Sequence, residues 1–361
     1  MPAPFSVSKY GYSGHAVAGF ARSIHLQRGL SLIELMVAIT ISLLLLTGLT
    51  SIYLSNSRSR SELDKSTRQI ENGRYAMELL SDDIRHAGFY GPMTTAPSLP
   101  ASITALPDPC YTALDGSADD LQSALGLPLQ GYAGTTTAAA LDTKLGCLKT
   151  AAVGYKPNTA VMVVRRIATT AGLSASNYNM QVSSCPGDPA PGWILSKTST
   201  DFTLHKNASP GCTPISGAPT ADIVPYFVHI YYVSTCSGTD CTAAGAVAVP
   251  TLKRIELGTT AMSAPVPLVD GIENLQFEYG VDNTNDGAPD VYMSAPAFAD
   301  WRNVMSVRVS LLSRSSEPTT GYTDAKAYQI GPVTVAASGD SYKRHAYSEL
   351  VRLNNPAGRR E

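Results

Sequence analysis

One apolar segment constrains this chain more than any other feature. Residues 30–54 contain a single side chain that is charged at neutral pH, Glu34, in about 25 residues, which is long enough for a helix to cross the hydrocarbon core of a bilayer. A secretory signal peptide has an apolar region of only ~7–15 residues, followed by a small residue at the cleavage site. Here the small residue, Gly29, precedes the apolar segment, so cleavage after Gly29 would leave the anchor on the mature chain.

The position of Glu34 indicates a role beyond anchoring. A carboxylate in an apolar segment costs roughly 2.5–3.5 kcal/mol on insertion scales, so it needs a partner or a compensating role. Cleavage after Gly29 would create a positive partner, the amine of Leu30, one helical turn from Glu34. The positive end of the helix dipole also favours an anion there. The alternative is an ordinary signal anchor whose acid lies at the membrane interface.

Residues 28–37, which read Arg-Gly-Leu-Ser-Leu-Ile-Glu-Leu-Met-Val, resemble the class III leader junction of type IV pilins and type II secretion pseudopilins. That family usually has Phe directly after the cleaved Gly and Thr next, whereas this chain has Leu30 and Ser31. The resemblance implies that a prepilin peptidase cuts after Gly29 and methylates the amine of Leu30. It also implies that Glu34 pairs with the amine of a neighbouring subunit during assembly.

Residues 1–29 are the leader that this cleavage would remove. They contain three cations, Lys9, Arg22 and Arg28, and no acid, which fits a segment on the cytoplasmic side of the inner membrane. The remainder of a single-pass protein would then lie in the periplasm. Loss of the leader lowers the formal net charge from −2 to −5. A chain without a global basic field gives no indication of nucleic-acid binding.

The helix is expected to continue beyond the membrane. No proline occurs from residue 30 to residue 88. Apolar residues recur at intervals of seven, at Leu63, Ile70, Met77 and Ile84. This pattern predicts one long helix, with 30–54 in the membrane and a periplasmic half, 55–91, that packs an apolar stripe on a domain. Gly88 and Pro92 are expected to end it.

Residues 92–361 are expected to form one β-rich globular domain. The part from 92 to 220 is rich in Ala, Thr, Gly, Pro and Ser, with short apolar strings such as 160–165 that predict buried strands between long loops. Four later segments alternate polar and apolar residues: 225–233, 252–257, 275–279 and 304–312. They predict an antiparallel sheet packed on the outer half of the helix. The predicted fold class is therefore α+β.

The C-terminal third resembles a more specific group of proteins than pilins in general. Residues 269–282 read Val-Asp-Gly-Ile-Glu-Asn-Leu-Gln-Phe-Glu-Tyr-Gly-Val-Asp, and residues 301–304, Trp-Arg-Asn-Val, lead into the last alternating segment. Both resemble PilW-type minor pilins, whereas residues 92–220 are not covered. The resemblance implies a pilin-like fold and a structural role in the tip or priming complex of a type IV pilus, in assembly, twitching motility and adhesion. The implied partners are the prepilin peptidase, other minor pilins, the major pilin and a pilus-tip adhesin.

Two other functions compete with this interpretation. A J-type minor pseudopilin of type II secretion shares the junction and the helix, although size and cysteine content favour the pilus. A membrane-tethered periplasmic enzyme or receptor would explain the soluble domain but leaves Gly29 and Glu34 without a role. The sequence contains no Gly-x-Ser-x-Gly, Gly-x-x-x-x-Gly-Lys or His-Glu-x-x-His motif, so we do not expect an enzyme.

All six cysteines follow the anchor: Cys110, Cys147, Cys185, Cys212, Cys236 and Cys241. Export to a periplasm permits disulfides, and six cysteines allow 15 pairings. Cys236 and Cys241 are expected to staple a small turn, and the other four are further disulfide candidates. Zinc is the alternative, but the chain has no Cys-x-x-Cys pair and no paired histidine spacing.

Residues 282–290, Asp-Asn-Thr-Asn-Asp-Gly-Ala-Pro-Asp, suggest a calcium loop. The candidate oxygen ligands are Asp282, Thr284, Asp286 and Asp290. Gly at the sixth position also fits, but the twelfth position is Met293 instead of the bidentate Glu of an EF-hand. The alternative is a polar hairpin turn with Asp-Gly at its tip. No other cofactor is expected.

Overall fold

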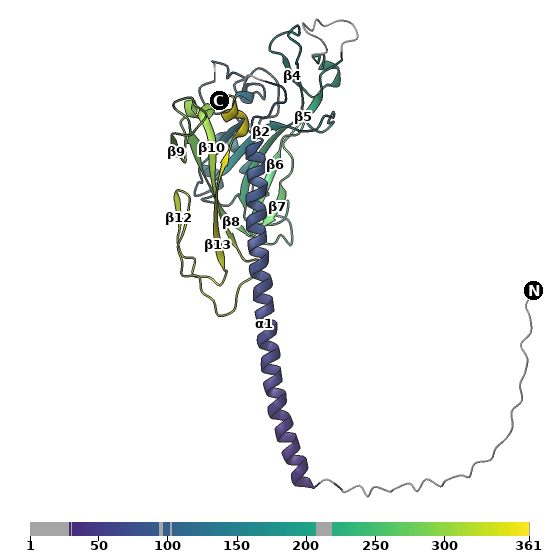
Figure 1. Ribbon diagram of the computed structural model, residues 1–361, viewed down its shortest axis with the longest axis vertical. Coiled ribbons are helices and arrows are strands. Elements are labelled where there is room, and N and C mark those ends of the chain that lie inside the picture. Colours follow the sequence, from purple (N-terminus) through teal and green to yellow (C-terminus); the bar gives the residue numbers. More distant parts are fainter. Residues whose placement is uncertain (1–28, 30, 94–96, 102, 207–218, 361) are drawn as a thin grey trace, which may run out of the picture. The chain divides into compact units, whose positions relative to one another are not determined.

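The computed structural model describes residues 29, 31–93, 97–101, 103–206 and 219–360. The described chain contains one long helix, several 3-10 helices, three antiparallel sheets and a short C-terminal helix (Figure 1). It divides into two compact units, Met1–Ser59 and Arg60–Glu361. The long helix begins in the first unit and ends in the second, which contains all the sheets.

Helix α1 (Leu32–Arg85) agrees with the long helix predicted from the proline-free sequence. Every side chain from residue 32 to residue 59 is exposed, including the large apolar ones. An 18-residue window has a mean hydropathy of 2.3 and no buried residue, so by length and composition this helix can cross a membrane. Apolar side chains that no other described residue covers are suited to a lipid environment.

The largest sheet has seven strands and is centred on β5. Strand β5 (Ile223–Ser234) lies antiparallel to β2 (Val161–Ile167), β3 (Asn179–Val182) and β6 (Thr251–Glu256). Three strands extend it: β1 (Leu129–Tyr132) beside β2, β4 (Trp193–Ser196) beside β3, and β7 (Val266–Asp270) beside β6. Strands β2 and β5 are rich in β-branched and aromatic residues, which suit a pleated, buried surface.

A second sheet has four strands in the order β13-β10-β8-β9. These are β8 (Ile272–Val281), β9 (Val291–Met293), β10 (Val304–Arg314) and β13 (Arg344–Arg352). A separate hairpin consists of β11 (Tyr328–Ile330) and β12 (Val333–Val335). The short helices are η1 (Ser123–Gly126), η2 (Ala138–Ala140), η3 (Thr143–Leu148), η4 (Ser199–Asp201), η5 (Phe298–Asn303) and α2 (Asn354–Gly358).

The prediction of a single C-terminal sheet is wrong. The first two alternating segments belong to β5 and β6 in the seven-stranded sheet, whereas the last two belong to β8 and β10 in the four-stranded sheet. The chain changes sheets at Gly271, whose backbone φ is +80°, a conformation that glycine adopts without strain. Alternation of polar and apolar residues identifies a strand and its buried face, but it does not specify the partner strand.

The outer part of α1 packs between these two sheets (Figure 1). Four apolar residues of α1, together with Ala87 just after its end, share one core with residues of both sheets: Ala76, Met77, Leu80 and Ile84. Gly73 permits a close approach to the four-stranded sheet, because a Cβ at this position would overlap the ring of Tyr347 on β13. The helix is therefore an integral part of the domain core from this point onwards.

The predicted apolar stripe of α1 is only half correct. Met77 and Ile84 are buried, but Leu63 and Ile70 are 66% and 40% exposed. The first buried residue of α1 is Gln69, so Leu63 precedes the turns that the sheets cover, and Ile70 lies off the buried face. Spacing along a helix reports its periodicity, whereas the position of the sheets decides which turns are covered.

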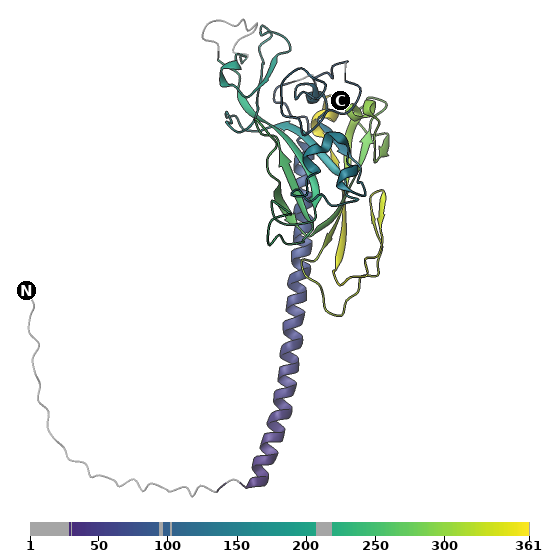
Figure 2. The same cartoon turned by 180° about the vertical axis from the view of Figure 1, so that it is seen from behind.

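Residues 92–220 include the predicted strand at 160–165, as part of β2. Helices η1 and η3 and the loops before them contribute five leucines to a second core: Leu121, Leu125, Leu141, Leu145 and Leu148. This core lies on the opposite face of the seven-stranded sheet, because β2 contributes Val161 and Val163 to it but Met162 and Val164 to the core around α1. Figure 2 shows this side of the domain.

Candidate functional site

The junction predicted from the sequence lies immediately before α1. Gly29 is exposed, and no heavy atom lies within 4 Å of the position of a Cβ on it. Leu30 lies outside the described residues. The first helical residue is Leu32, three positions after Gly29. Cleavage after Gly29 and methylation of Leu30 remain predictions.

Ser31 and Glu34 form a capping box at the start of α1. The Ser31 Oγ accepts a hydrogen bond from the N–H of Glu34 at 3.2 Å, and the Glu34 Oε2 accepts one from the N–H of Ser31 at 2.9 Å. Each side chain thus satisfies a backbone N–H that the first helical turn leaves without a partner. The Ser-x-x-Glu spacing of residues 31–34 is the sequence signature of such a box and could have predicted it.

The carboxylate of Glu34 remains available to a second partner. Its side chain is exposed, and its Oε1 makes no hydrogen bond within the part of the chain that the structure describes. An ionised carboxylate has about four acceptor positions, and one N–H occupies only one of them. The geometry therefore allows Glu34 to cap its own helix and to accept an amine at the same time.

Asp83 joins α1 to the seven-stranded sheet. Its side chain is buried, and its carboxylate accepts hydrogen bonds from Arg166 Nε on β2 at 2.5 Å, from His229 Nδ1 on β5 at 2.7 Å and from Tyr231 Oη on β5 at 2.8 Å. His229 is thus a buried residue of β5 whose ring is held by a hydrogen bond to the helix. Nothing in the sequence links these residues, because at least 83 positions separate Asp83 from each partner.

The partners of Asp83 keep its carboxyl ionised. Burial by itself would raise the pKa of Asp83, but the hydrogen bond and Coulombic attraction of His229, together with Arg166, outweigh burial and hold the pKa well below its usual range. A buried charge is tolerated only when such partners satisfy it. The network is therefore a fixed attachment of the helix, and no described cavity is lined by Asp83.

A second polar cluster attaches the C-terminal segment to α1. Glu62 accepts hydrogen bonds from Thr319 Oγ1 at 2.6 Å and from Lys343 Nζ at 2.9 Å. These two hydrogen bonds lower the pKa of Glu62 to about 2. Two turns further along, Gln69 Nε2 donates to the carbonyl of Ser313 at 3.1 Å. This part of α1 thus contacts the domain through polar groups instead of the predicted Leu63 and Ile70.

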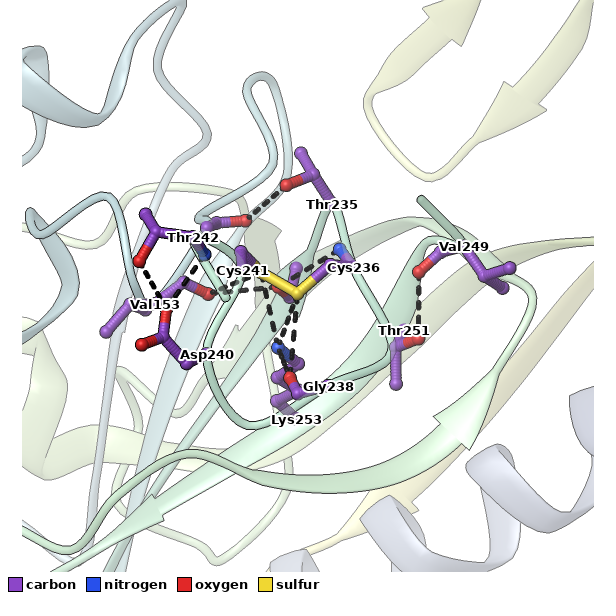
Figure 3. Close-up of a disulfide and its surroundings, with 12 residues drawn as sticks. Val153, Thr235, Cys236, Gly238, Asp240, Cys241, Thr242, Val249, Thr251 and Lys253 are labelled. Atoms are coloured by element: carbon purple, nitrogen blue, oxygen red, sulfur yellow. Dashed lines mark hydrogen bonds between the residues drawn. A yellow bond between two sulfur atoms is a disulfide. The ribbon is translucent and has the colours of Figure 1, made fainter. Parts of the chain in front are cut away.

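Cys236 and Cys241 form the predicted staple, which closes the loop after β5 (Figure 3). Figure 3 shows that Lys253 of β6 points at this disulfide. The Nζ of Lys253 donates to the carbonyl of Gly238 at 2.5 Å and lies 3.4 Å from the Sγ of Cys236. Burial lowers the pKa of Lys253. The staple and the lysine together order a loop that contains no regular secondary structure.

The other cysteines are also used in disulfides. Cys110 and Cys147 are bonded to each other and join the loop before η1 to η3. Cys185 is disulfide-bonded, whereas Cys212 lies outside the described residues. Among the described cysteines none is free. The six candidates predicted from the sequence thus include at least five that form disulfides.

The proposed calcium loop forms a turn between β8 and β9. Asp282 is buried, and its carboxylate accepts hydrogen bonds from the N–H groups of Asn285 at 2.5 Å and Gly287 at 2.9 Å. Its Oδ2 also pairs with Arg360 Nη1 at 3.0 Å. Although burial would raise the pKa of Asp282, the N–H of Gly287 and the guanidinium of Arg360 lower it to about 2.

The remaining calcium candidates serve the same turn. Asp290 Oδ2 accepts the N–H of Asn283 at 2.7 Å and of Thr284 at 3.0 Å, and Asp286 Oδ1 accepts the N–H of Ala288 at 2.9 Å. Within the described residues no group of three or more His, Cys, Asp or Glu side chains could hold a metal ion. The geometry matches the alternative of a polar hairpin turn, and calcium binding remains an untested prediction.

Two family models match this chain. Residues 24–50 match the prokaryotic N-terminal methylation motif, and residues 230–355 match the type IV pilus-assembly protein W family, PilW. These are the two parts of the chain that carry the sequence resemblance. The matches confirm the predicted resemblance to PilW-type minor pilins, and residues 92–220 lie outside both.

Among solved structures, a type IV-like pilin from Thermus thermophilus is similar to this chain at 12% sequence identity. The alignment covers 56% of this chain and 81% of that chain, with a TM-score of 0.28. A comparison with curated proteins finds no match. The assignment therefore depends on the two family models and on the residues at the junction.

Proposed function

We propose that this chain, a type IV pilin-like protein with a PilW domain and an N-terminal methylation motif, is a minor subunit of the type IV pilus. It joins other minor pilins in the complex that primes assembly and then forms the tip of the filament. Pilus assembly, twitching motility and adhesion depend on it. Its partners are the prepilin peptidase, the other minor pilins, the major pilin and a pilus-tip adhesin.

The single observation that carries this proposal is the position of Glu34 and the free hydrogen-bonding capacity of its carboxylate. It is the one acid in the apolar residues 30–54, one turn after the predicted cleavage bond, and one of its oxygens has no partner among the described residues. A simple membrane anchor has no use for such an acid, which costs free energy in lipid. A filament subunit uses it, because the new amine of Leu30 on a neighbouring copy or a related subunit would neutralise it.

The localisation follows from the same segment. The leader, residues 1–29, stays in the cytoplasm until it is removed, residues 30–54 cross the inner membrane once, and residues 55–361 lie in the periplasm. The disulfides Cys110–Cys147 and Cys236–Cys241 support an oxidising compartment for the folded domain. After assembly, the subunit is at the cell surface as part of the pilus.

Residues 92–220 support a position at the tip. Neither family match covers them, and part of them forms the additional core on the outer face of the seven-stranded sheet. A subunit with such a layer and with long stapled loops would crowd its neighbours in a repeating shaft. At the tip of a filament, the same layer has no subunit above it.

The first experiment determines the mature N-terminus. The protein is purified from native membranes with and without the prepilin peptidase and examined by intact mass and terminal sequencing. A chain that begins at a methylated Leu30, and only when the peptidase is present, is the expected result. A chain that still begins at residue 1 or 2 in both strains would reject the pilin pathway and favour a membrane-tethered enzyme or receptor.

A second experiment separates the pilus from type II secretion. The PilW match favours the pilus, but the J-type pseudopilin shares the junction. A deletion strain is examined for surface pili by electron microscopy and for secreted enzymes in the culture medium. Loss of pili with normal secretion is expected, whereas normal pili with lost secretion would assign the chain to type II secretion.

The protein is proposed to be structural, without catalytic activity. The family match is to a pilus-assembly protein. The most chemically suggestive group of described residues, Asp83 with His229 and Tyr231, is buried and fully used in attaching α1 to the sheet. A buried network without access for a substrate is expected of a structural attachment.

A further inference from the structure

A cavity of about 590 Å³ lies where the edges of the sheets approach the β11–β12 hairpin. Its lining comes from the end of β1, the loop before β2, strand β8 and the segment around β12. The volume falls within the range of pockets that hold small organic ligands, about 300–1,000 Å³. Neither the predicted junction nor the polar attachments of α1 contribute residues to it.

Three side chains of β8 line this cavity with hydrogen-bonding atoms that have no partner. Asn274, Gln276 and Tyr279 are all more than nine-tenths buried. Gln276 Nε2 donates to Asn274 Oδ1 and to the carbonyl of Asn158, both at 2.8 Å. This leaves Gln276 Oε1, Asn274 Nδ2 and the Tyr279 hydroxyl without hydrogen bonds in the described part of the chain.

These three atoms belong to residues that line the cavity. None of them belongs to the set of enclosed polar atoms without a partner, which includes the hydroxyl of Tyr226. Gly131 of β1 leaves the space for the Tyr279 hydroxyl, because a Cβ at this glycine would overlap it. Buried polar groups are normally hydrogen-bonded, so a ligand that both donates and accepts hydrogen bonds would suit the unused donors and acceptors of these lining residues.

Lys156 adds a cation to the same cavity. Its side chain is partly buried, and its ammonium has no ion pair or hydrogen bond among the described residues. Burial lowers the pKa of Lys156, partly opposed by the charge of Glu273. Glu273 does not pair with it, because its carboxylate is held by Arg344 at 2.5 Å. An anionic ligand would compensate the burial of this ammonium.

The remaining walls are mostly apolar, with Phe277 on β8 and Pro332 and Val333 beside the hairpin. The cavity therefore combines one cation, several neutral groups that both donate and accept hydrogen bonds, and apolar surfaces. Hydroxyl groups match such neutral groups best, because each hydroxyl is both a donor and an acceptor. A purely apolar acid would leave Asn274, Gln276 and Tyr279 without partners.

We propose that this cavity binds a small carboxylated sugar, with the carboxylate on Lys156 and the hydroxyls on Asn274, Gln276 and Tyr279. The site is independent of the junction at Gly29 and Glu34. A pilus subunit with this site would contact acidic saccharides on a surface, but the binding itself does not depend on the proposed role in the pilus.

The test uses the full chain in detergent and saturation-transfer NMR with sodium glucuronate as the probe. Glucose is the neutral match that retains the hydroxyls, and N-acetylglycine is a carboxylate without them. Glucuronate is expected to show saturation transfer at millimolar concentration, with glucose and N-acetylglycine each about tenfold weaker or more, because a charged hydrogen bond or several neutral ones are lost.

Two variants locate the binding. Lys156→Met and Tyr279→Phe are each expected to weaken glucuronate binding, Lys156→Met by about tenfold or more. Tyr279→Phe keeps the ring that packs against Trp301, so it tests the hydroxyl even if Lys156→Met fails to fold. Lys326→Met is the matched control, because Lys326 is an exposed lysine outside the cavity.

Three outcomes would overturn the proposal. The first is an absence of saturation transfer from glucuronate. The second is unchanged binding in folded Lys156→Met and Tyr279→Phe, which would place the ligand elsewhere. The third is equal binding of N-acetylglycine, which would make the ligand a simple carboxylate, such as a peptide C-terminus.

Discussion

The carboxylate of Asp83 on α1 accepts a hydrogen bond from Nδ1 of His229 on β5 at 2.7 Å, and both side chains are buried. This contact joins residues 146 positions apart and sets the rotation of the helix against the larger sheet. Around it, Arg166 and Tyr231 complete the coordination of the same carboxylate. The position of the helix in the domain thus depends on a polar contact as well as on the apolar core.

We expect Asp83→Asn to lower the free energy of unfolding by about 3–5 kcal/mol, because it leaves the partly buried Arg166 and the buried His229 without the carboxylate that pairs with them. Denaturant unfolding of the detergent-solubilised chain, followed by tryptophan fluorescence, measures the change. The adjacent Asp82→Asn is the control, because the side chain of Asp82 is 69% exposed, and it should change stability by less than about 0.5 kcal/mol. Equal effects of the two variants would contradict the role of Asp83.

The Glu62 cluster predicts an acid-dependent attachment of the C-terminal segment. The folded pKa of Glu62, about 2, is below its ordinary value of 4.5, so its contribution to stability is present above pH 4.5 and is lost as the pH falls towards 2. Glu62→Gln should therefore lower the thermal midpoint at pH 7, and its difference from the wild type should shrink between these pH values. Glu71→Gln, at an exposed position of the same helix, is the control. A difference that does not change with pH would argue against titration of Glu62.

At the junction, Glu34→Gln separates assembly from processing. Cleavage after Gly29 should remain, because the altered residue lies beyond the bond, but the amount of the subunit in sheared surface pili should fall by at least about tenfold when the ion pair is lost. Immunoblots of membrane and pilus fractions measure both. Ser31→Ala removes the capping hydroxyl at a cost of about 1 kcal/mol and keeps the charge. If Ser31→Ala abolished incorporation equally, the cap and not the charge of Glu34 would be the cause.

The two described disulfides should contribute unequally to stability. A disulfide restricts the unfolded chain, and the restriction grows with the length of the loop that it closes. The predicted stabilisation is about 4 kcal/mol for Cys110–Cys147, with a separation of 37, and about 2 kcal/mol for Cys236–Cys241, with a separation of 5. Each pair is replaced by serines, and the loss is measured by denaturant unfolding. A larger loss from the shorter staple would mean that its contacts with Lys253 outweigh the constraint on the unfolded chain.

For the turn at 282–290, we expect no heat on titration with millimolar calcium. The carboxylate of Asp282 already accepts backbone N–H groups and Arg360, so an ion would have to displace them. Isothermal titration calorimetry of the full chain, with magnesium as the reference ion, provides the measurement. Heat from calcium that disappears in Asp290→Asn would establish the site suggested by the sequence. Arg360→Met should instead lower the thermal midpoint, because it leaves Asp282 without its counter-ion.

The sequence by itself determined the features that depend on neighbouring residues. A proline-free, continuously apolar run predicts a long membrane helix, and alternating segments predict strands, because both patterns are properties of a local backbone geometry. The junction at Gly29 and Glu34 is visible for the same reason, since its parts lie within six consecutive residues. The staple between Cys236 and Cys241 was also predictable, because only a short loop separates them.

Only the tertiary structure decided which distant groups meet. The separation of the C-terminal strands into two sheets, the exposure of Leu63 and the attachment of Asp83 to His229 all depend on contacts between residues far apart in the sequence. The cavity at Lys156 is assembled in the same way, from β1, β8 and the β11–β12 hairpin. Local periodicity fixes which face of an element is apolar, but the partner of that face is chosen by packing of the whole domain, which no single segment encodes.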